Sequence, residues 1–449
     1  MTSNAPAPGS LPRPPRPSRE GALGPRFVPD PLEVLPELAR ALGDVVDLGE
    51  SQPAYLLSNP RDIEFVHVQT GRLFDKGYLN SPALERLFGR GLVVSEGDFW
   101  LRQRRMAQPA FHRDRIGGYG AVMVDLARRM LAGWQDGEER DAHADMMRVT
   151  LDIIVKTLFD SDMDARARAF GQSMDDMLGA MAELYIAAPQ DQERVAGRFY
   201  AATGRIDAFV EGVIQERRES GEDRGDLLSM LLAAQDDEAR GMTDQQLLDE
   251  AKNLIMAGHE TTSNTLSWTW WLLSRHPEVE AKLHAELDEV LGGEAPKVED
   301  LGRLPYARQV ILESMRILPP VWSVGRVARQ DLELGGFFVP RGTVLSMSQW
   351  VVHRDERWFP DPLTFRPERW EDGLEKKLPR YAYFPFGGGP RVCIGENFAR
   401  MEAVLLLAAI AQQYRLRVPP GFEVELEPSI TLRPRHGLKV RLERRSEVK

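Results

Sequence analysis

Hydrophobic residues recur at spacings of three and four through most of the chain, the pattern of helices that bury one face. This periodicity predicts helices over residues 118–134, 145–159, 195–218, 226–236, 244–274 and 277–290. The helix over 244–274 is expected to end at His276-Pro277, because a proline disfavours helical geometry in the residue before it. At about 1.5 Å per residue, its roughly 30 residues would form a rod about 45 Å long, enough to cross a domain.

Short alternating runs separated by Gly and Pro predict strands at 55–57, within 332–347 and within 430–442. The predicted fold class is therefore mainly α with a small β portion. Residues 1–30 are rich in proline, with "PRPPRPSR" at their centre, and predict a flexible leader; a docking ligand for a partner is the alternative. Neither a repeat nor a linker interrupts the rest, so residues 31–449 predict a single domain.

The composition narrows the class of protein. Of the 449 residues, 43% are hydrophobic and 28% charged, the balance of a soluble globular protein with a large core. A net charge of -11 gives no general attraction to nucleic acid or anionic membranes. The sequence has no apolar run near the roughly 18 residues of a membrane span, and no signal peptide. Because Cys393 is the only cysteine, no internal disulfide can form. Together these features predict a cytoplasmic protein.

Polar residues interrupt the middle of the longest predicted helix, in "IMAGHETTSNT", residues 255–265. His259-Glu260 begins the H-E-x-x-H pattern, which binds zinc through two histidines one turn apart. The second position of that pattern is Ser263, so zinc is not expected here. These polar groups need another explanation.

Cys393 lies in "YFPFGGGPRVCIGENFARMEAVLLLAAIA", a glycine-rich turn that leads into an apolar helix. A helix N-terminus favours the thiolate form of a cysteine. An inert, buried cysteine is the alternative. The pattern F-x-x-G-x-R-x-C-x-G resembles the haem-ligand loop of the cytochrome P450 family, and its positions are filled by Phe386, Gly389, Arg391, Cys393 and Gly395.

This resemblance extends from about residue 30 to residue 440. It implies the cytochrome P450 fold, with haem between the long oxygen-binding helix and the helix that follows the cysteine loop. The cofactor would be haem b, with Cys393 as the axial thiolate that donates electron density to iron. Glycines would let the backbone approach the flat macrocycle, and Arg391 would neutralise a propionate.

Further segments match the family in order and spacing. Glu313 and Arg316 of "ILESMRIL" form an E-x-x-R element, with Arg369 of "FRPERW" as the implied third member of a scaffold triad. A surface ion pair is the alternative interpretation of a single E-x-x-R. The resemblance also implies that haem propionates are bound by Trp100, Arg104, Arg326 and Lys76.

The polar residues of the long helix resemble the oxygen-activating element A-G-x-[DE]-T of the family, filled by Ala257, Gly258, Glu260 and Thr261. Ala257 and Thr261 share a face, and a threonine hydroxyl can bond the carbonyl four residues back, which makes space for a water. In the implied mechanism Thr261 orients that water and Glu260 relays protons. We assign no chemical role to His259, which is expected to be surface-facing or structural, or to Thr262, which is expected to pack.

Electrons are expected from separate proteins, because we expect no flavin or iron-sulfur domain in this chain. The expected donor is a ferredoxin or flavodoxin with its reductase, supplied ultimately by NAD(P)H. Basic residues expected near the cysteine could dock an acidic donor, although such residues are most often a solvated face: Arg102, Arg105, Lys376, Lys377, Arg380 and Arg400.

The segments that line the pocket in this family are apolar here and offer no charged anchor. We therefore predict hydroxylation, with dioxygen, of a hydrophobic molecule such as a terpenoid, a carotenoid or a fatty acid. Two alternatives are a peroxide-driven haem-thiolate peroxygenase and a haem-binding sensor or electron carrier. The predicted pocket residues, any of which could be ordinary core, are Leu79, Leu84, Phe88, Met181, Leu184, Tyr185, Leu254, Val321, Trp322, Val324 and Ile430.

Overall fold

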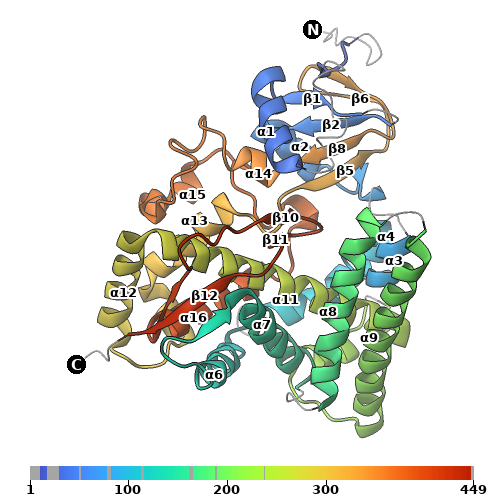
Figure 1. Ribbon diagram of the computed structural model, residues 1–449. Coiled ribbons are helices and arrows are strands. Elements are labelled where there is room, and N and C mark those ends of the chain that lie inside the picture. The colour runs from blue at the N-terminus through green and yellow to red at the C-terminus, as the bar shows by residue number, and fades with distance from the viewer. Residues whose placement is uncertain are drawn as a thin grey trace. The chain divides into compact units, whose positions relative to one another are not determined.

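The computed structural model describes residues 11–17, 30–49, 52–77, 82–112, 116–160, 165–187, 190–236 and 238–445. The chain forms two units, each assembled from separate stretches of sequence (Figure 1). The sheet unit consists of Met1–Leu79, Gln309–Cys393 and Leu426–Arg433. The helical unit consists of Asn80–Arg308, Ile394–Glu425 and Pro434–Lys449. The sequence predicted one domain over 31–449, and that stays a prediction beside these two units.

The helical unit is organised around α11 (Asp244–Arg275), the long helix that the sequence predicted. It begins with a capping box, in which Thr243 and Gln246 satisfy each other's backbone N–H groups, and it ends at His276 before Pro277. The other elements of this unit are α3 (Pro82–Phe88), α4 (Gly97–Ala107), η3 (Gln108–Phe111), α6 (Gly120–Leu131), β4 (Glu139–Asp141), α7 (Ala142–Phe159), α8 (Ala165–Ile186), α9 (Gln192–Ser220), α10 (Leu227–Ala233), α12 (Pro277–Leu291), η4 (Val298–Arg303), α16 (Glu396–Ala411), β9 (Tyr414–Arg417) and β12 (Lys439–Arg444).

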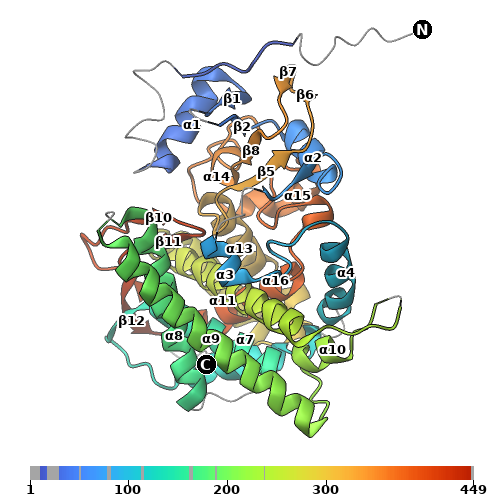
Figure 2. The ribbon, with the colours of Figure 1, turned by 90° about the vertical axis from the view of Figure 1, so that its right-hand side faces the viewer.

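Several helices cover α11 inside this unit. α7 and α9 pack along it, and α16 also contacts it. α8 lies side by side with α9 (Figure 2). Because neighbours contact it on several sides, α11 is buried almost all round, which explains why its sequence is less clearly amphipathic than that of a surface helix.

The sheet unit contains a five-stranded sheet in the order β1-β2-β8-β5-β3. The parallel pairing of β2 with β8 joins Ala54 to Val344, residues far apart in sequence, while the other pairs are antiparallel. The elements of this unit are α1 (Pro31–Leu42), β1 (Val45–Asp47), β2 (Ala54–Leu57), α2 (Pro60–Val68), β3 (Phe74–Asp75), α13 (Pro305–Ile317, which begins in the helical unit), β5 (Val324–Ala328), β6 (Leu332–Leu334), β7 (Phe337–Val339), β8 (Val344–Met347), α14 (Gln349–Val352), η5 (Pro367–Gly373), α15 (Leu374–Lys377), η6 (Gly389–Arg391), β10 (Leu426–Pro428) and β11 (Leu432–Pro434).

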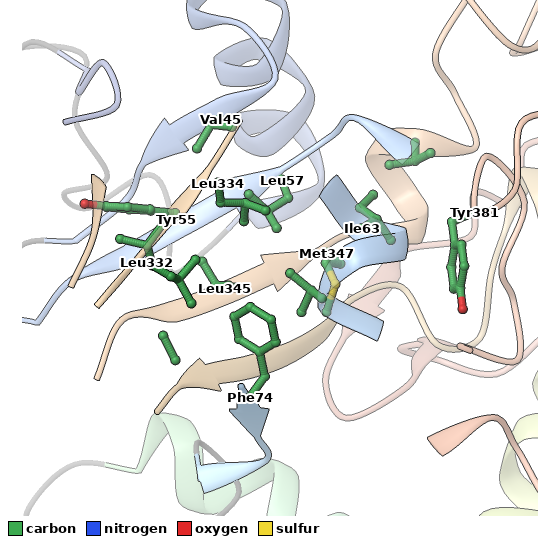
Figure 3. Close-up of a cluster of buried hydrophobic side chains, with 14 of the residues drawn as sticks. Val45, Tyr55, Leu57, Ile63, Phe74, Leu332, Leu334, Leu345, Met347 and Tyr381 are labelled. Carbon is green, nitrogen blue, oxygen red and sulfur yellow. The ribbon is translucent and has the colours of Figure 1, made fainter. Parts of the chain in front are cut away.

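One face of this sheet is covered by apolar side chains from distant segments. Figure 3 shows Phe74 of β3 gathered with Leu345 and Met347 of β8 and with Ile63 of α2, although β5 lies between the two strands. Tyr381, from the segment that leads to the cysteine loop, belongs to the same cluster. The core of the sheet therefore also supports the loop that carries Cys393.

The N-terminal prolines include an attached segment. Backbone N–H groups of Asp47 and Phe338 donate to the carbonyls of Pro15 and Pro12, both at 2.9 Å, and Arg16 pairs with Asp47 at 3.0 Å. Residues 11–17 are therefore not the free tail that the sequence predicted, because their carbonyls satisfy strand N–H groups that would otherwise lack a partner. Residues 1–10 and 18–29 lie outside the described part of the chain.

The predicted helices over 118–134, 145–159, 195–218, 226–236, 244–274 and 277–290 correspond to α6, α7 and α9 to α12, with ends that shift by a few residues. The predicted strands correspond to β2, β6 to β8, β11 and β12. The sequence analysis missed β1, β3, β4, β5, β9 and β10, whose short runs take up strand geometry only beside their partners. In the described part of the chain, no helix is long and apolar enough to cross a membrane.

Candidate active site

Cys393 lies at the end of a loop in the sheet unit, shortly before α16. Its backbone N–H donates to the carbonyl of Phe386 at 3.0 Å, which closes the loop, and its side chain is exposed. The buried, inert cysteine considered from the sequence is therefore excluded. An exposed thiol in a loop closed by its own backbone can bind a metal that arrives with other ligands.

The glycines of this loop meet a tight steric requirement. Gly389 has φ of +61°, and a Cβ there would lie 2.2 Å from the carbonyl oxygen of His67 on α2. Its neighbour Gly388 would clash with the ring of Tyr381 in the same way. The sequence analysis expected these glycines to admit a macrocycle; for Gly388 and Gly389 the structure gives a different reason, close packing against the protein itself.

His67 connects the cysteine loop with two predicted propionate partners. Its buried ring stacks on Tyr381, with centroids 5.0 Å apart. Burial, together with the positive charges of Arg326 and Lys76, lowers the pKa of His67 to about 3, so the ring is neutral. The sheet unit thus brings Arg326, Lys76 and the cysteine loop into one neighbourhood. The sequence analysis missed His67, because nothing in "IEFVHVQT" distinguishes it from a surface histidine.

Arg326 is held rigidly within β5. Its side chain is buried, and it donates to the Thr70 hydroxyl at 3.1 Å and to the Gly325 carbonyl at 2.6 Å. Arg391, in η6, is half-buried. Trp100 and Arg104 lie one turn apart on α4 in the helical unit, and both are half-buried. Their binding of propionates stays a prediction.

α11 exposes a single spot in its central part. Every residue from Leu247 to Leu273 is buried except Ala257, Gly258, Thr261 and Trp271. We refer to Ala257, Gly258 and Thr261 as the exposed patch of α11. They are three of the four residues of the predicted oxygen-activating element; the fourth, Glu260, is buried.

Hydroxyl groups around this patch bond back to the helix itself. Thr261 Oγ1 donates to the carbonyl of Ala257 at 2.7 Å, as expected from the sequence, and Thr265 Oγ1 donates to the carbonyl of Thr261 at 2.9 Å. Such side-chain bonds compete for helix carbonyls and tend to bend the helix locally. Glu260, next to the patch, is buried at 7% exposure. A buried carboxylic acid beside a half-buried hydroxyl can exchange protons with it through water.

Glu402, which the sequence analysis missed, contacts the same part of α11 at Thr262. It is a buried residue of α16, and burial raises its pKa to about 8, an effect that a hydrogen bond with Thr262 partly opposes. Thr262 therefore does more than pack. The available signal was the lone acid in the apolar run "MEAVLLLAAIA".

His259 has a structural role. It is 1% exposed, its Nδ1 lies 3.2 Å from the Ile255 carbonyl, and burial lowers its pKa to about 4. Of the two roles considered for it from the sequence, surface-facing and structural, the structure selects the second.

The E-x-x-R element forms a buried ion-pair cluster. Glu313 and Arg316 have fully buried side chains 2.8 Å apart, and Arg369 contacts Glu313 at 3.2 Å. Arg316 also donates to the carbonyls of His353 and Pro362. The surface-pair alternative is therefore excluded, because this cluster joins α13 to the segments that precede the cysteine loop.

The predicted pocket residues are divided between the units. In the helical unit Leu84, Phe88, Met181 and Leu254 are buried and Leu184 is half-buried. In the sheet unit a hydrogen bond from Trp322 Nε1 to the Ser429 carbonyl, at 2.9 Å, brings the loop after α13 next to Ile430. Trp322 and Val324 also pack against core clusters, which favours the ordinary-core interpretation for these two; Val321 is half-buried. Leu79 and the side chain of Tyr185 lie outside the described residues.

The residues around Cys393 fit a haem. Among the described residues, no group of three or more His, Cys, Asp or Glu side chains could hold a metal ion. Haem iron brings most of its ligands with it and takes one thiolate from the protein, which the exposed Cys393 can supply. Rigid cations such as Arg326 suit the carboxylates that haem also carries.

The predicted docking cations differ in availability. The guanidinium of Arg102 already has partners within the chain. It pairs with Asp236 at 2.7 Å and donates to the carbonyls of Arg240 and Gly241. Arg380 and Arg400 form pairs with Glu64 and Glu396, whereas Lys376 and Lys377 are exposed on α15.

Comparisons with known proteins agree with this arrangement. A family model described as Cytochrome P450 matches residues 28–440. Cyclooctat-9-en-7-ol 5-monooxygenase of Streptomyces melanosporofaciens is 40% identical over 406 residues, 87% of this chain and 86% of that protein. Pentalenene oxygenase of Streptomyces avermitilis is 33% identical over 424 residues, 93% of each chain. The crystal structure of the cytochrome P450DA heme domain is 27% identical with a TM-score of 0.89, over 97% of this chain and 98% of that one. This likeness confirms the predicted fold class.

Proposed function

The chain belongs to the cytochrome P450 family and is a haem-thiolate monooxygenase, and on this premise we propose that it hydroxylates a cyclic terpenoid. The observation that carries the proposal is identity of 40% and 33%, over most of the chain, with relatives named for cyclooctat-9-en-7-ol and pentalenene. The buried apolar residues Phe88, Leu254 and Met181 of the helical unit support it, because an apolar wall favours a hydrocarbon skeleton.

A haem held through the Cys393 thiolate would supply the iron chemistry that reduces dioxygen and oxidises a C–H bond. The residues of this chain have the remaining tasks. Arg326, Arg391, Arg104, Trp100 and Lys76 would hold the propionates, whose negative charge suits fixed cations.

Thr261 and Glu260 would manage protons at the exposed patch of α11. The Thr261 hydroxyl donates to Ala257 at 2.7 Å, so its oxygen is fixed in position and can accept a hydrogen bond from a water. The buried carboxyl of Glu260 would pass protons from solvent to that water, since reduction of dioxygen consumes them.

Electrons would come from NAD(P)H through a reductase and a ferredoxin or flavodoxin. The exposed Lys376 and Lys377 are better placed to meet an acidic donor than Arg102, which is already paired. The cytoplasm is the proposed location, since a chain with a single cysteine forms no internal disulfide, which suits a reducing compartment.

The test starts with the reduced carbon monoxide spectrum and with spectral titrations of the ferric protein against terpenoids, carotenoids and fatty acids. A thiolate-type band and a saturable shift to high spin with a cyclic terpenoid are expected. Turnover with a surrogate ferredoxin and reductase, followed by mass spectrometry, should give the terpenoid with one added oxygen.

Three results would contradict the proposal. Product with hydrogen peroxide but none with reduced ferredoxin would favour the peroxygenase. A sixth iron ligand from the protein that blocks carbon monoxide would favour the sensor or electron carrier. A spin shift with fatty acids and with no terpenoid would mean that the substrate is a fatty acid and not a cyclic terpenoid.

A further inference from the structure

Three polar side chains near the start of α11 bind the backbone of a distant segment. Asp249, Glu250 and Asn253 are 5%, 1% and 2% exposed. Buried polar groups of this kind require hydrogen-bonding partners. Here the partners are peptide groups of residues 88–93, which we call the 88–93 turn, at the end of α3 (Figure 2).

The hydrogen bonds run stepwise along the 88–93 turn. The N–H of Arg90 donates to Asp249 at 2.8 Å, that of Leu92 donates to Glu250 at 3.1 Å, and that of Val93 donates to Asn253 Oδ1 at 2.9 Å. Asn253 Nδ2 donates in return to the Phe88 carbonyl at 2.6 Å. Side chains of α11 thus satisfy four backbone groups of a turn that has no ladder of its own.

Glycines in the turn make this approach possible. A Cβ at Gly89, where φ is +54°, would lie 2.0 Å from Asp249 Oδ1. A Cβ at Gly91 would lie 2.0 Å from Asn253 Nδ2. A side chain at either position would displace the acceptor or donor that it meets. The hydrogen bonds between α11 and the 88–93 turn therefore require glycine at both 89 and 91.

The contact lies close to the chemistry. Asn253, Ala257 and Thr261 follow one another at four-residue intervals and therefore share a face of α11. Asn253 is about 6 Å, one turn, before the exposed patch of α11. The 88–93 turn is consequently fixed at the border of that patch, and it carries the buried side chain of Phe88.

A second set of charges ties the same region to α9. Lys252, 4% exposed, pairs with Asp207 of α9 at 2.9 Å, and Arg86 of α3 pairs with the same carboxylate at 2.5 Å. α3, α9 and α11 therefore meet at one carboxylate, which limits the freedom of α3 beside the turn.

We propose that Asp249, Glu250 and Asn253 are positioning residues that fix the 88–93 turn at the border of the exposed patch of α11 and thereby hold the apolar side chain of Phe88 where a substrate would contact it. This inference rests on the proposed function and adds the residues that determine its specificity. The sequence patterns of the family resemblance assign them no role.

The test compares two nitrogen ligands of haem iron on the holoprotein. Imidazole needs little space, whereas 4-phenylimidazole also needs the apolar wall. For Asn253→Ala we expect 4-phenylimidazole to bind about tenfold more weakly and imidazole to bind within about twofold of the wild type. Hydrogen exchange of the peptide that contains Arg90, Leu92 and Val93 should become faster, while the carbon monoxide spectrum keeps its thiolate band.

Further variants, in the turn and on α11, distinguish a positioning role from a general loss of stability. Gly91→Ala should weaken 4-phenylimidazole similarly but add little in the Asn253→Ala background, because the clashing side chain is then gone. Asp249→Asn, which keeps an acceptor for Arg90, should bind better than Asp249→Ala. Thr269→Val removes a buried hydroxyl near the other end of α11, far along the helix from Asn253. This control variant should bind both ligands with wild-type affinity.

Equal weakening of both ligands, unchanged exchange in the 88–93 turn, or additive effects of Gly91→Ala and Asn253→Ala would overturn the inference. Neither azole is a terpenoid. If the azole pattern holds while no terpenoid shifts the spin state, the proposed substrate fails and the positioning role stands.

Discussion

At the scale of single residues, the hydroxyl of Thr261 shows how position determines a role. Three of the four threonines of α11, those at 261, 265 and 269, follow one another at four-residue intervals, and each is bonded to the carbonyl four residues earlier. Only Thr261 belongs to the exposed patch of α11, and the other two are buried. The same local bond therefore has a proposed chemical use at Thr261 and a packing use at the other two positions.

Replacement Thr261→Ala should uncouple electron use from product formation. Without the hydroxyl, the water that delivers protons has no fixed partner, and product per NADPH should fall about tenfold while NADPH is still consumed. The measurement is the ratio of product to NADPH with the surrogate donor. Thr265→Val is the matched control and should keep the wild-type ratio; equal ratios in all three proteins would contradict the role.

Glu402 predicts a pH dependence of stability. Burial raises its pKa from 4.5 to about 8, so between these values the folded protein holds a proton that the unfolded chain has lost. Its contribution to stability is complete below about pH 4.5 and is lost as the pH rises toward 8. Relative to Glu402→Gln, the wild type should lose about 2–4 kcal/mol of unfolding free energy between about pH 5 and pH 8.5.

Denaturant unfolding at several pH values measures this difference. Glu299→Gln, at an exposed position, should show no pH-dependent difference from the wild type. Parallel pH profiles for the wild type and Glu402→Gln would mean that Glu402 ionises normally in the folded protein.

At the scale of elements, the buried cluster of Glu313, Arg316 and Arg369 holds α13 against the segments before the cysteine loop. Trp370 Nε1 adds a hydrogen bond to Glu313 at 2.9 Å. Every oxygen of Glu313 thus has a fixed donor, and removal of one partner leaves a buried charge unsatisfied.

Replacement Arg316→Lys should destabilise the protein by about 3–5 kcal/mol, because an ammonium cannot reproduce the fork that contacts Glu313 and two carbonyls. The yield of protein with bound haem should fall in parallel. Denaturant unfolding and the haem-to-protein absorbance ratio measure both effects. Arg303→Lys, in an exposed pair with Asp300, should change stability by less than about 1 kcal/mol; a similarly small change for Arg316→Lys would refute the scaffold role.

At the scale of the whole molecule, each unit is assembled from segments far apart in the chain. The sheet unit combines the N-terminal segment with residues after 309, and residues 11–17 lie along its edge. The carbonyls of Pro12 and Pro15 accept strand N–H groups, and Arg16 neutralises Asp47, which is 6% exposed.

The stability of the protein should therefore fall only when an N-terminal truncation removes residues 11–17. Removal of residues 1–17 should lower the free energy of unfolding by about 2 kcal/mol, because two backbone hydrogen bonds and a partly buried ion pair are lost. Removal of residues 1–10 should leave it nearly unchanged. Thermal melts of the two truncated proteins beside the full chain decide this, and equal melting temperatures for all three would show that residues 11–17 do not stabilise the sheet.

The sequence by itself predicted six of the helices, α6, α7 and α9 to α12, together with the cysteine loop and the oxygen-activating element, because each depends on residues near one another in the chain. Periodicity placed α11 within one residue of its ends, and local motifs selected Cys393, Thr261 and the E-x-x-R pair. Only the tertiary structure decided which polar side chains are buried and what they meet. Asp249, Glu250 and Asn253 look like a solvated face in "LLDEAKNLIM", and Glu402 looks like a chance acid in an apolar helix. Their partners lie about 140–160 positions away, and a hydrogen bond or a raised pKa exists only once folding has brought such partners together and excluded water.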